Sequence, residues 1–269
     1  MKKHLNFLFF IIFSISLAFI IILSTMLIKW HNDNKLTNKQ IEDINDIVKI
    51  KEKETNTNDD NVETVNENNT NEYWYYINMP FIDVDFSNLT SINSDTIGWV
   101  NVPSTNINYP VVQTNNNDYY LKHSFKKEYT DAGWIFMDFR NNSDFNNKNT
   151  IIYGHSRLNK TMFGTLKYTL TSNWFNNKDN RIVRISTKDY NYLYQIFSSY
   201  KIDTETYYLT VNFNDDNEYT KFLNTIKDRS IFNYNTNVNK DDIIITLSTC
   251  SENNKKTVVH AKLIKKESK

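Results

Sequence analysis

The stretch DIIITLSTC, residues 242–250, alternates like a β-strand and ends on Cys250, the one cysteine in the chain. Successive side chains of a strand point to opposite faces. Ser248 and Cys250 therefore share the more polar face, which we expect to look toward a surface, while Ile245 and Leu247 point inward. A lone thiol cannot form an internal disulfide, so it is either an inert buried group or a candidate nucleophile.

The sequence around this stretch is rich in further strand patterns, which begin after Tyr73 and continue to the C-terminus. They are IGWVNV (97–102), INYPVV (107–112), GWIFM (133–137), TIIYG (150–154), RIVRIS (181–186), YLYQIFSSY (192–200) and TVVHAKLI (257–264). Residues 162–175 and 216–227 have helical patterns. Many strands with few helices predict a mostly β domain with some α structure, either a closed barrel or a sandwich.

The N-terminal segment is apolar and long. Residues 5–28 carry no charge, and at about 1.5 Å per residue they can span a hydrocarbon core of roughly 30 Å. Lys2 and Lys3 precede this run and favour a cytoplasmic N-terminus. A cleaved signal peptide is the alternative, but its apolar region is usually shorter. We expect residues 1–30 to be an uncleaved single-pass anchor and the rest of the chain to be extracellular.

Residues 31–72 predict a stalk in two parts. Apolar residues recur at helical spacing over residues 36–50, which predicts an amphipathic helix. That helix could pack on the domain, lie on the membrane or pair with another copy. Residues 54–72 contain no aromatic side chain and predict a solvated linker. The remaining residues, 73–269, form the predicted domain.

A catalytic cysteine needs a nearby base or cation to form its thiolate. Of the five histidines, His155 is the best candidate, because it follows an apolar strand and Gly154. His260 lies inside the last strand, where a hydrogen-bonded core histidine is the commoner outcome. His123 is expected to be a surface or structural residue. The other two histidines belong to the anchor and the stalk.

Six sequence blocks together resemble the sortases, most closely the class B sortases. In the family's order and approximate spacing they are WVNVPSTNINYPVVQ (99–113), NNNDYYLKHSF (115–125), GWIFMDFRN (133–141), NTIIYGHSRLNKTMFGTL (149–166), TLSTC (246–250) and VVHAKLI (258–264). The resemblance covers roughly residues 73–266. It implies an eight-stranded β-barrel with short helices, preceded by a transmembrane helix, on the surface of a Gram-positive cell.

The resemblance also implies a reaction. Cys250 matches the family's nucleophile and His155 its histidine. The implied activity is transpeptidation, in which a sorting motif of a surface protein is cleaved after threonine through a thioacyl enzyme. An amine of a peptidoglycan precursor, or a pilin lysine, then takes the acyl group. His155 would give a proton to the leaving amine and later accept one from the attacking amine.

The third catalytic position departs from the family pattern. The resemblance implies an arginine shortly after the cysteine, yet Lys256 occupies that position and no arginine follows Cys250. Lysine offers a point charge where arginine offers a bidentate fork. We expect Lys256 to be the functional substitute, with Arg157 as a weaker option. Ser248 and Tyr200 are further candidates, as residues that bind substrate.

Composition bears on which other classes of function remain open, including nucleic-acid binding and metal-dependent activity. The charges balance at 31 basic and 31 acidic residues, which gives no general attraction to nucleic acid. No cluster of carboxylates suggests a metal, so no cofactor is predicted. The leading prediction is an active membrane-anchored cysteine transpeptidase. A catalytically weak or inactive module that binds sorting-signal peptides is the alternative, because of Lys256. A secreted cysteine peptidase is disfavoured, because papain-like surroundings of the cysteine are absent.

Overall fold

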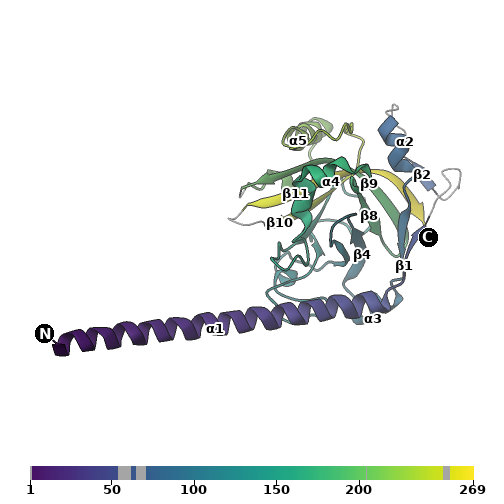
Figure 1. Cartoon of the computed structure of the whole chain (residues 1–269). Helices are drawn as coiled ribbons and strands as arrows, with labels where there is room; N and C mark the ends of the chain where they lie inside the picture. The colour runs from purple at the N-terminus through teal and green to yellow at the C-terminus, as the bar shows by residue number, and fades with distance from the viewer. Residues whose placement is uncertain (1, 54–61, 65–70, 204, 251–254) are drawn as a thin grey trace.

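A computed structural model describes residues 2–53, 62–64, 71–203, 205–250 and 255–269. Eight strands close into a mixed β-barrel, as predicted, in the order β10-β7-β6-β5-β4-β8-β9-β11, with β10 pairing back onto β11 (Figure 1). Their bounds are β4 Thr96–Asn101, β5 Asn108–Val112, β6 Phe136–Met137, β7 Asn149–Gly154, β8 Ile182–Ser186, β9 Tyr190–Ile202, β10 Ile244–Cys250 and β11 Lys256–Ser268. Each of the eight strand patterns in the sequence corresponds to one of these strands.

Three short strands lie outside the barrel and were not predicted. Strand β1 (Ile50–Lys53) pairs antiparallel with β3 (Phe81–Val84), and β2 (Val62–Thr64) pairs with the end of β11. At β2 the backbone of the expected linker pairs with the barrel over three residues. Residues 54–61 and 65–70 of the expected linker lie outside the described residues.

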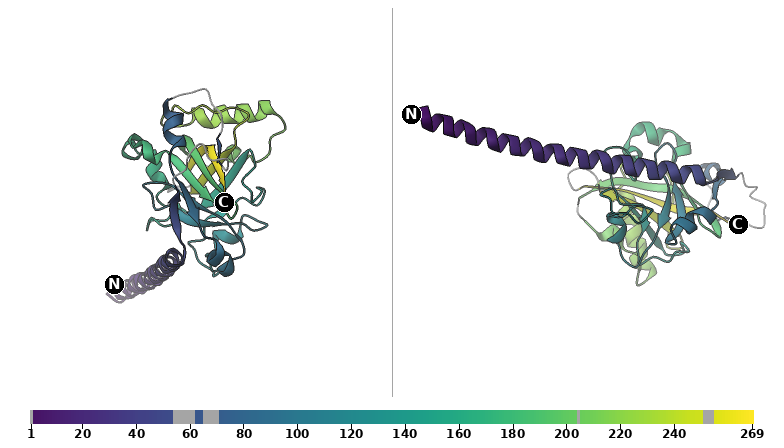
Figure 2. Two further views of the ribbon diagram at one scale, coloured as in Figure 1. Left: turned by 90° about the vertical axis from the view of Figure 1, so that its right-hand side faces the viewer. Right: turned by 90° about the horizontal axis from the view of Figure 1, so that it is seen from below.

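The first helix, α1 (Lys2–Ile47), is a single element of 46 residues. Its N-terminal part projects away from the barrel, and its C-terminal part lies along the domain (Figures 1 and 2). Ile44 joins the main hydrophobic core, and Thr37 and Gln40 are buried as well. Of the three placements left open for the amphipathic segment, the structure shows packing on the domain.

Four shorter helices complete the fold: α2 Asn71–Ile77, α3 Ser87–Ile92, α4 Ser172–Asn176 and α5 Asp216–Asp228. Helix α5 is the one predicted over residues 216–227, and the Asp215 carboxylate caps its first turn. The helix predicted over residues 162–175 is instead a 3₁₀ turn, η2 (Leu166–Leu170), followed by α4. Thr171 separates the two, because its backbone is extended and its hydroxyl accepts a hydrogen bond from the Trp174 amide.

Two hydrophobic clusters cover the two faces of β10. Ile245 and Leu247 belong to the main core inside the barrel, as predicted. Ile244, on the other face, packs in a second cluster under α5 and the β9–α5 connection. Ser248 on that face is only 3% exposed. Aromatic side chains of the connection therefore cover most of this face, which the sequence had placed toward a more polar surface.

His260 is buried on the same outer side of the barrel, in a defined hydrogen-bond chain. The Thr246 hydroxyl donates to Asn149 Oδ1 over 2.7 Å, so it accepts from His260 Nδ1, 2.8 Å away. His260 Nε2 then accepts from the Tyr200 hydroxyl at 2.9 Å. Burial lowers the pKa of His260 to about 3, so the imidazole is neutral. This is the structural histidine that the sequence predicted.

This histidine should make stability depend on pH. Its pKa is about 3 in the folded chain and about 6.5 when unfolded, so the unfolded state binds the proton first as pH falls. Stability is then lost between about pH 6.5 and 3. We expect a loss of about 2 kcal/mol between pH 7 and 5, measured by urea unfolding of the full chain in micelles. His260→Asn should show a pH dependence smaller by about that amount, whereas equal slopes would contradict the assignment.

Candidate active site

The candidate nucleophile and base follow two adjacent parallel strands. Strands β7 and β10 run side by side with Thr249 opposite Gly154. Cys250 and His155 come next on the two strands, and neighbouring strands lie about 4.8 Å apart. The side chain of Cys250 lies outside the part of the chain that the structure describes. The backbone register alone therefore brings these two positions together.

The third candidate, Lys256, lies next to Cys250 because β10 and β11 form a hairpin. Strands β10 and β11 pair antiparallel, with Cys250 opposite Lys256. The Lys256 side chain is half-buried, and its Nζ lies 5.8 Å from the centre of the Tyr208 ring. An ammonium group over an aromatic face is held by the negative face of the ring. Lys256 is therefore placed beside the cysteine with its cation on the outer side of the barrel.

An open cavity of about 240 Å³ joins these elements. The described residues that line it are Asn117, Asp118, Leu121, Phe136, Tyr153, Gly154, His155, Ser248, Thr249 and Lys256. Two of the predicted catalytic residues and Ser248 thus face one space. Its lining combines aromatic and aliphatic side chains with polar and charged ones.

One ring nitrogen of His155 is held by the backbone. His155 Nε2 lies 2.8 Å from the Leu121 carbonyl oxygen. Because a carbonyl can only accept, Nε2 carries its proton in this contact, and Nδ1 is the nitrogen left to exchange protons. Gly133 permits this placement: its φ is +58°, and a Cβ there would come within 2.9 Å of His155 Cδ2. The ring is thus confined by backbone on two sides.

The two candidate substrate-binding residues have different surroundings. Ser248 lines the cavity, and its hydroxyl is hydrogen-bonded to the Tyr208 hydroxyl at 2.9 Å. Tyr208 therefore contacts both Ser248 and Lys256. Tyr200 is buried in the second hydrophobic cluster and bonds to His260. Tyr200 does not line the cavity, because its hydroxyl is directed to His260 within the second hydrophobic cluster.

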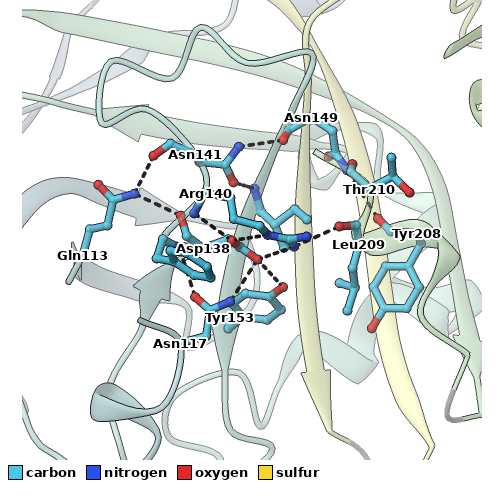
Figure 3. A network of polar contacts seen from close by, with 12 residues as sticks. Gln113, Asn117, Asp138, Arg140, Asn141, Asn149, Tyr153, Tyr208, Leu209 and Thr210 are labelled. Carbon is cyan, nitrogen blue, oxygen red and sulfur yellow. Dashed lines mark hydrogen bonds and ion pairs between the residues drawn. The ribbon is translucent and has the colours of Figure 1, made fainter. Parts of the chain in front are cut away.

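A polar network behind the cavity centres on the buried carboxylate of Asp138 (Figure 3). Asp138 accepts from Asn117 at 3.1 Å, from the Tyr153 hydroxyl at 2.8 Å, and from two guanidinium nitrogens of Arg140 at 2.7 and 2.8 Å. Burial raises the pKa of Asp138, but these hydrogen bonds outweigh it and hold that pKa below its usual range. Since Asn117 and Tyr153 line the cavity, Asp138 fixes one of its walls.

The same network extends to the connection between β9 and α5. Arg140 donates to the Leu209 carbonyl at 3.0 Å, and the Asn149 amide donates to the carbonyls of Tyr208 and Thr210 at 3.3 and 2.8 Å (Figure 3). These bonds hold the turn that carries Tyr208. Sequence reasoning missed this role: Asp138 and Arg140 stood only within the block GWIFMDFRN. Their spacing gave no signal of a bidentate pair.

The arrangement suits acyl transfer. The register places the Cys250 backbone next to His155 and Lys256; an imidazole in that position can activate a thiol as a thiolate, and a cation there can stabilise an oxyanion. Lys256 is the cation that the described residues bring to the cavity. Arg157, the weaker option, has its guanidinium 2.7 Å from the Asp33 carboxylate on α1, so it is engaged elsewhere.

Comparison with known proteins agrees with this geometry. The sortase domain family model matches residues 100–264. Sortase B of Staphylococcus aureus is 40% identical over 184 residues, which cover 67% of this chain and 75% of that protein. Sortase B of Listeria monocytogenes is 37% identical over 171 residues, which cover 62% of this chain and 67% of that protein.

Solved structures give the same result. A substrate complex of S. aureus sortase B superimposes with a TM-score of 0.63 at 40% identity, covering 67% of this chain and 84% of that one. Sortase B of Clostridium perfringens superimposes with a TM-score of 0.63 at 35% identity, covering 67% of this chain and all of that one. The chain therefore belongs to the sortase family, in its class B, and is a cysteine transpeptidase of the kind that attaches proteins to the cell wall.

Proposed function

We propose that this enzyme cleaves a C-terminal sorting motif after threonine and transfers the new carboxyl end to a cell-wall amine. The observation that supports this most directly is the register of β7, β10 and β11, which gathers Cys250, His155 and Lys256 at one end of the barrel. The cavity of about 240 Å³ beside them would receive the motif.

The proposed reaction has two halves. The Cys250 thiolate attacks the threonine carbonyl carbon, the peptide C–N bond breaks, and the leaving amine takes a proton from His155. The acceptor amine then attacks the thioester, its proton passes to His155, and the thiolate is released. Atoms and charge balance, because His155 returns to its starting state. Lys256 would stabilise the oxyanion in both halves.

The acceptor and the cellular site are part of the proposal. A sortase B 40% identical to this chain has been solved in a complex with triglycine, which supports a peptidoglycan-linked amine as acceptor here, with a pilin lysine as the other option. The N-terminal part of α1 is long and apolar enough to cross a membrane. We propose that it anchors the enzyme as a single pass, with the N-terminus in the cytoplasm and the barrel outside the cell.

One observation favours a second candidate function. A lysine replaces the arginine of the family pattern, and its point charge cannot offer two parallel hydrogen bonds. If that loss abolished turnover, the domain would act as a surface module that binds sorting-signal peptides without cleaving them.

A peptide experiment separates the two functions. The full chain in detergent micelles is incubated with a library of threonine-containing peptides, with and without triglycine, and followed by intact mass spectrometry. We expect a thioacyl adduct that maps to Cys250 and a triglycine-dependent product cut after threonine. Peptide binding without any adduct would identify the binding module instead, and neither binding nor adduct would contradict both.

A further inference from the structure

The C-terminal part of α1 contacts the domain through a shielded ion pair. Asp33 Oδ2 lies 2.7 Å from an Arg157 guanidinium nitrogen, and the two side chains are only 11% and 10% exposed. The next helix residue, Asn34, accepts from Arg157 and, at 2.9 Å, from the Asn159 amide. Two consecutive residues of α1 therefore hold the loop that begins just after His155.

The Asp33 carboxylate also binds a second loop. Its other oxygen accepts a hydrogen bond from the Thr130 hydroxyl and one from the Asp131 amide, the latter at 3.2 Å. One carboxylate on the anchor helix thus joins two loops that come from different parts of the barrel. Removing it would leave the Arg157 charge uncompensated in a shielded place, which is costly.

Both loops lead directly to the candidate base. Arg157 is two residues beyond His155. In the other loop, the Gly133 amide donates to the Thr130 carbonyl at 3.3 Å, and Gly133 lies directly against the His155 ring. Leu121, which precedes that loop, supplies the carbonyl that holds His155 Nε2. A shift of either loop therefore displaces the ring or its acceptor.

The other ionic contacts of α1 differ from this one. Lys29 pairs with Asp131 where the side chains are 68% and 49% exposed, and Asp43 pairs with Lys126 where they are 40% and 37% exposed. Such solvated pairs contribute little free energy. Asp33 is thus the anchor-helix acid whose contact is both shielded and connected to the catalytic end of the barrel.

From this we propose that Asp33 is a positioning residue for His155, so the helix that anchors the protein is also part of its catalytic unit. The inference rests on the proposed role of His155 in transpeptidation. Asp33 acts at a distance: it fixes the loops on both sides of the imidazole, which keeps Nε2 on the Leu121 carbonyl and Nδ1 directed to the reaction.

The first test compares Asp33→Asn with Asp43→Asn in the full chain in micelles. Each change removes one carboxylate charge from the same helix, but Asp43 pairs only with the solvated Lys126 side chain, whereas Asp33 bonds to Arg157, Thr130 and Asp131. We expect Asp33→Asn to lower kcat about tenfold with KM changed less than twofold, since small misplacements of a catalytic group act on the chemical step. Asp43→Asn should leave both constants unchanged.

The second test measures the tautomer of the His155 imidazole directly and needs no turnover of a substrate. In ¹⁵N-histidine-labelled protein, long-range correlation spectra report the tautomer of each ring. We expect wild-type His155 to be protonated at Nε2, and Asp33→Asn to shift its tautomer ratio while the His260 signals stay in place. This readout remains valid even if no sorting peptide is turned over, so failure of the proposed function and failure of this inference can be told apart.

The inference is overturned if Asp33→Asn matches Asp43→Asn in both kcat and the His155 spectrum. It is also overturned if the only effect is a lower melting temperature, because Asp33 would then be a structural tether. Should Asp33→Asn fail to fold, Asn34→Ala removes an acceptor of Arg157 and Asn159 but keeps the carboxylate. The same change in the His155 signals is expected from it, and its absence counts against the proposal.

Discussion

Lys256→Ala is expected to lower kcat/KM for sorting-peptide transfer by about 10²-fold, the usual scale for loss of an oxyanion donor. The reason is geometric: Lys256 stands opposite Cys250 in the β10–β11 register and lines the cavity, with its Nζ above the Tyr208 ring. Lys256→Arg should preserve or raise the rate, because the guanidinium keeps the charge and adds a second donor. Single-turnover acylation with a peptide substrate measures both variants.

Lys255→Ala is the matched control. Lys255 is the preceding residue, its side chain is half exposed, and it pairs with the more exposed Asp203. The change removes the same charge from the same turn without touching the cavity, so it should leave the rate within about twofold, as expected for a surface pair. If Lys256→Ala behaves like Lys255→Ala, the oxyanion is stabilised by another group.

His155→Ala is expected to have the larger effect, a loss of about 10²–10⁴ in kcat, the range typical of a general acid and base. In the proposed mechanism, loss of the imidazole removes both the base that activates Cys250 and the proton donor for the leaving amine. The measurement is kcat/KM for peptide cleavage between pH 5 and 9.

His31→Ala serves as the control for that variant, because His31 is an exposed residue of α1 remote from the cavity. It should match the wild type in rate and pH profile. A residual activity of His155→Ala within threefold of wild type would assign the proton transfers to another residue.

The strands of the barrel were predictable from apolar patterns in the sequence, although β6 has only two residues, and the resemblance to the sortases implied their closure into a barrel. The three strands β1, β2 and β3 were not, since each has four residues or fewer and depends on pairing with a distant part of the chain. The single helix predicted over residues 162–175 was wrong for a related reason. The apolar spacing fits one helix, but the Thr171 hydroxyl accepts a hydrogen bond from the Trp174 amide and starts a new helix there. Tertiary contacts and local capping outweighed the periodicity.

The candidate site was predictable only in part. A strand-end position and a neighbouring glycine singled out Cys250 and His155, and alternation correctly put Ser248 on the face opposite Leu247. Alternation could not show that Tyr208 covers that face, because Tyr208 comes from a connection 40 residues away in sequence. The link between Asp33 and Arg157 spans 124 residues and has no local pattern at all.

The unbroken course of α1 has a consequence for how the enzyme would meet its clients. A flexible stalk would let the barrel sweep a wide volume above the bilayer, whereas α1 runs without a break from its apolar segment to the part that packs on the barrel, which would hold the barrel at a fixed height. The effective concentration of a membrane-held client at the groove would then be set by the client's own tether. Clients whose sorting motif cannot reach that fixed height would be excluded, whatever their affinity for the cavity.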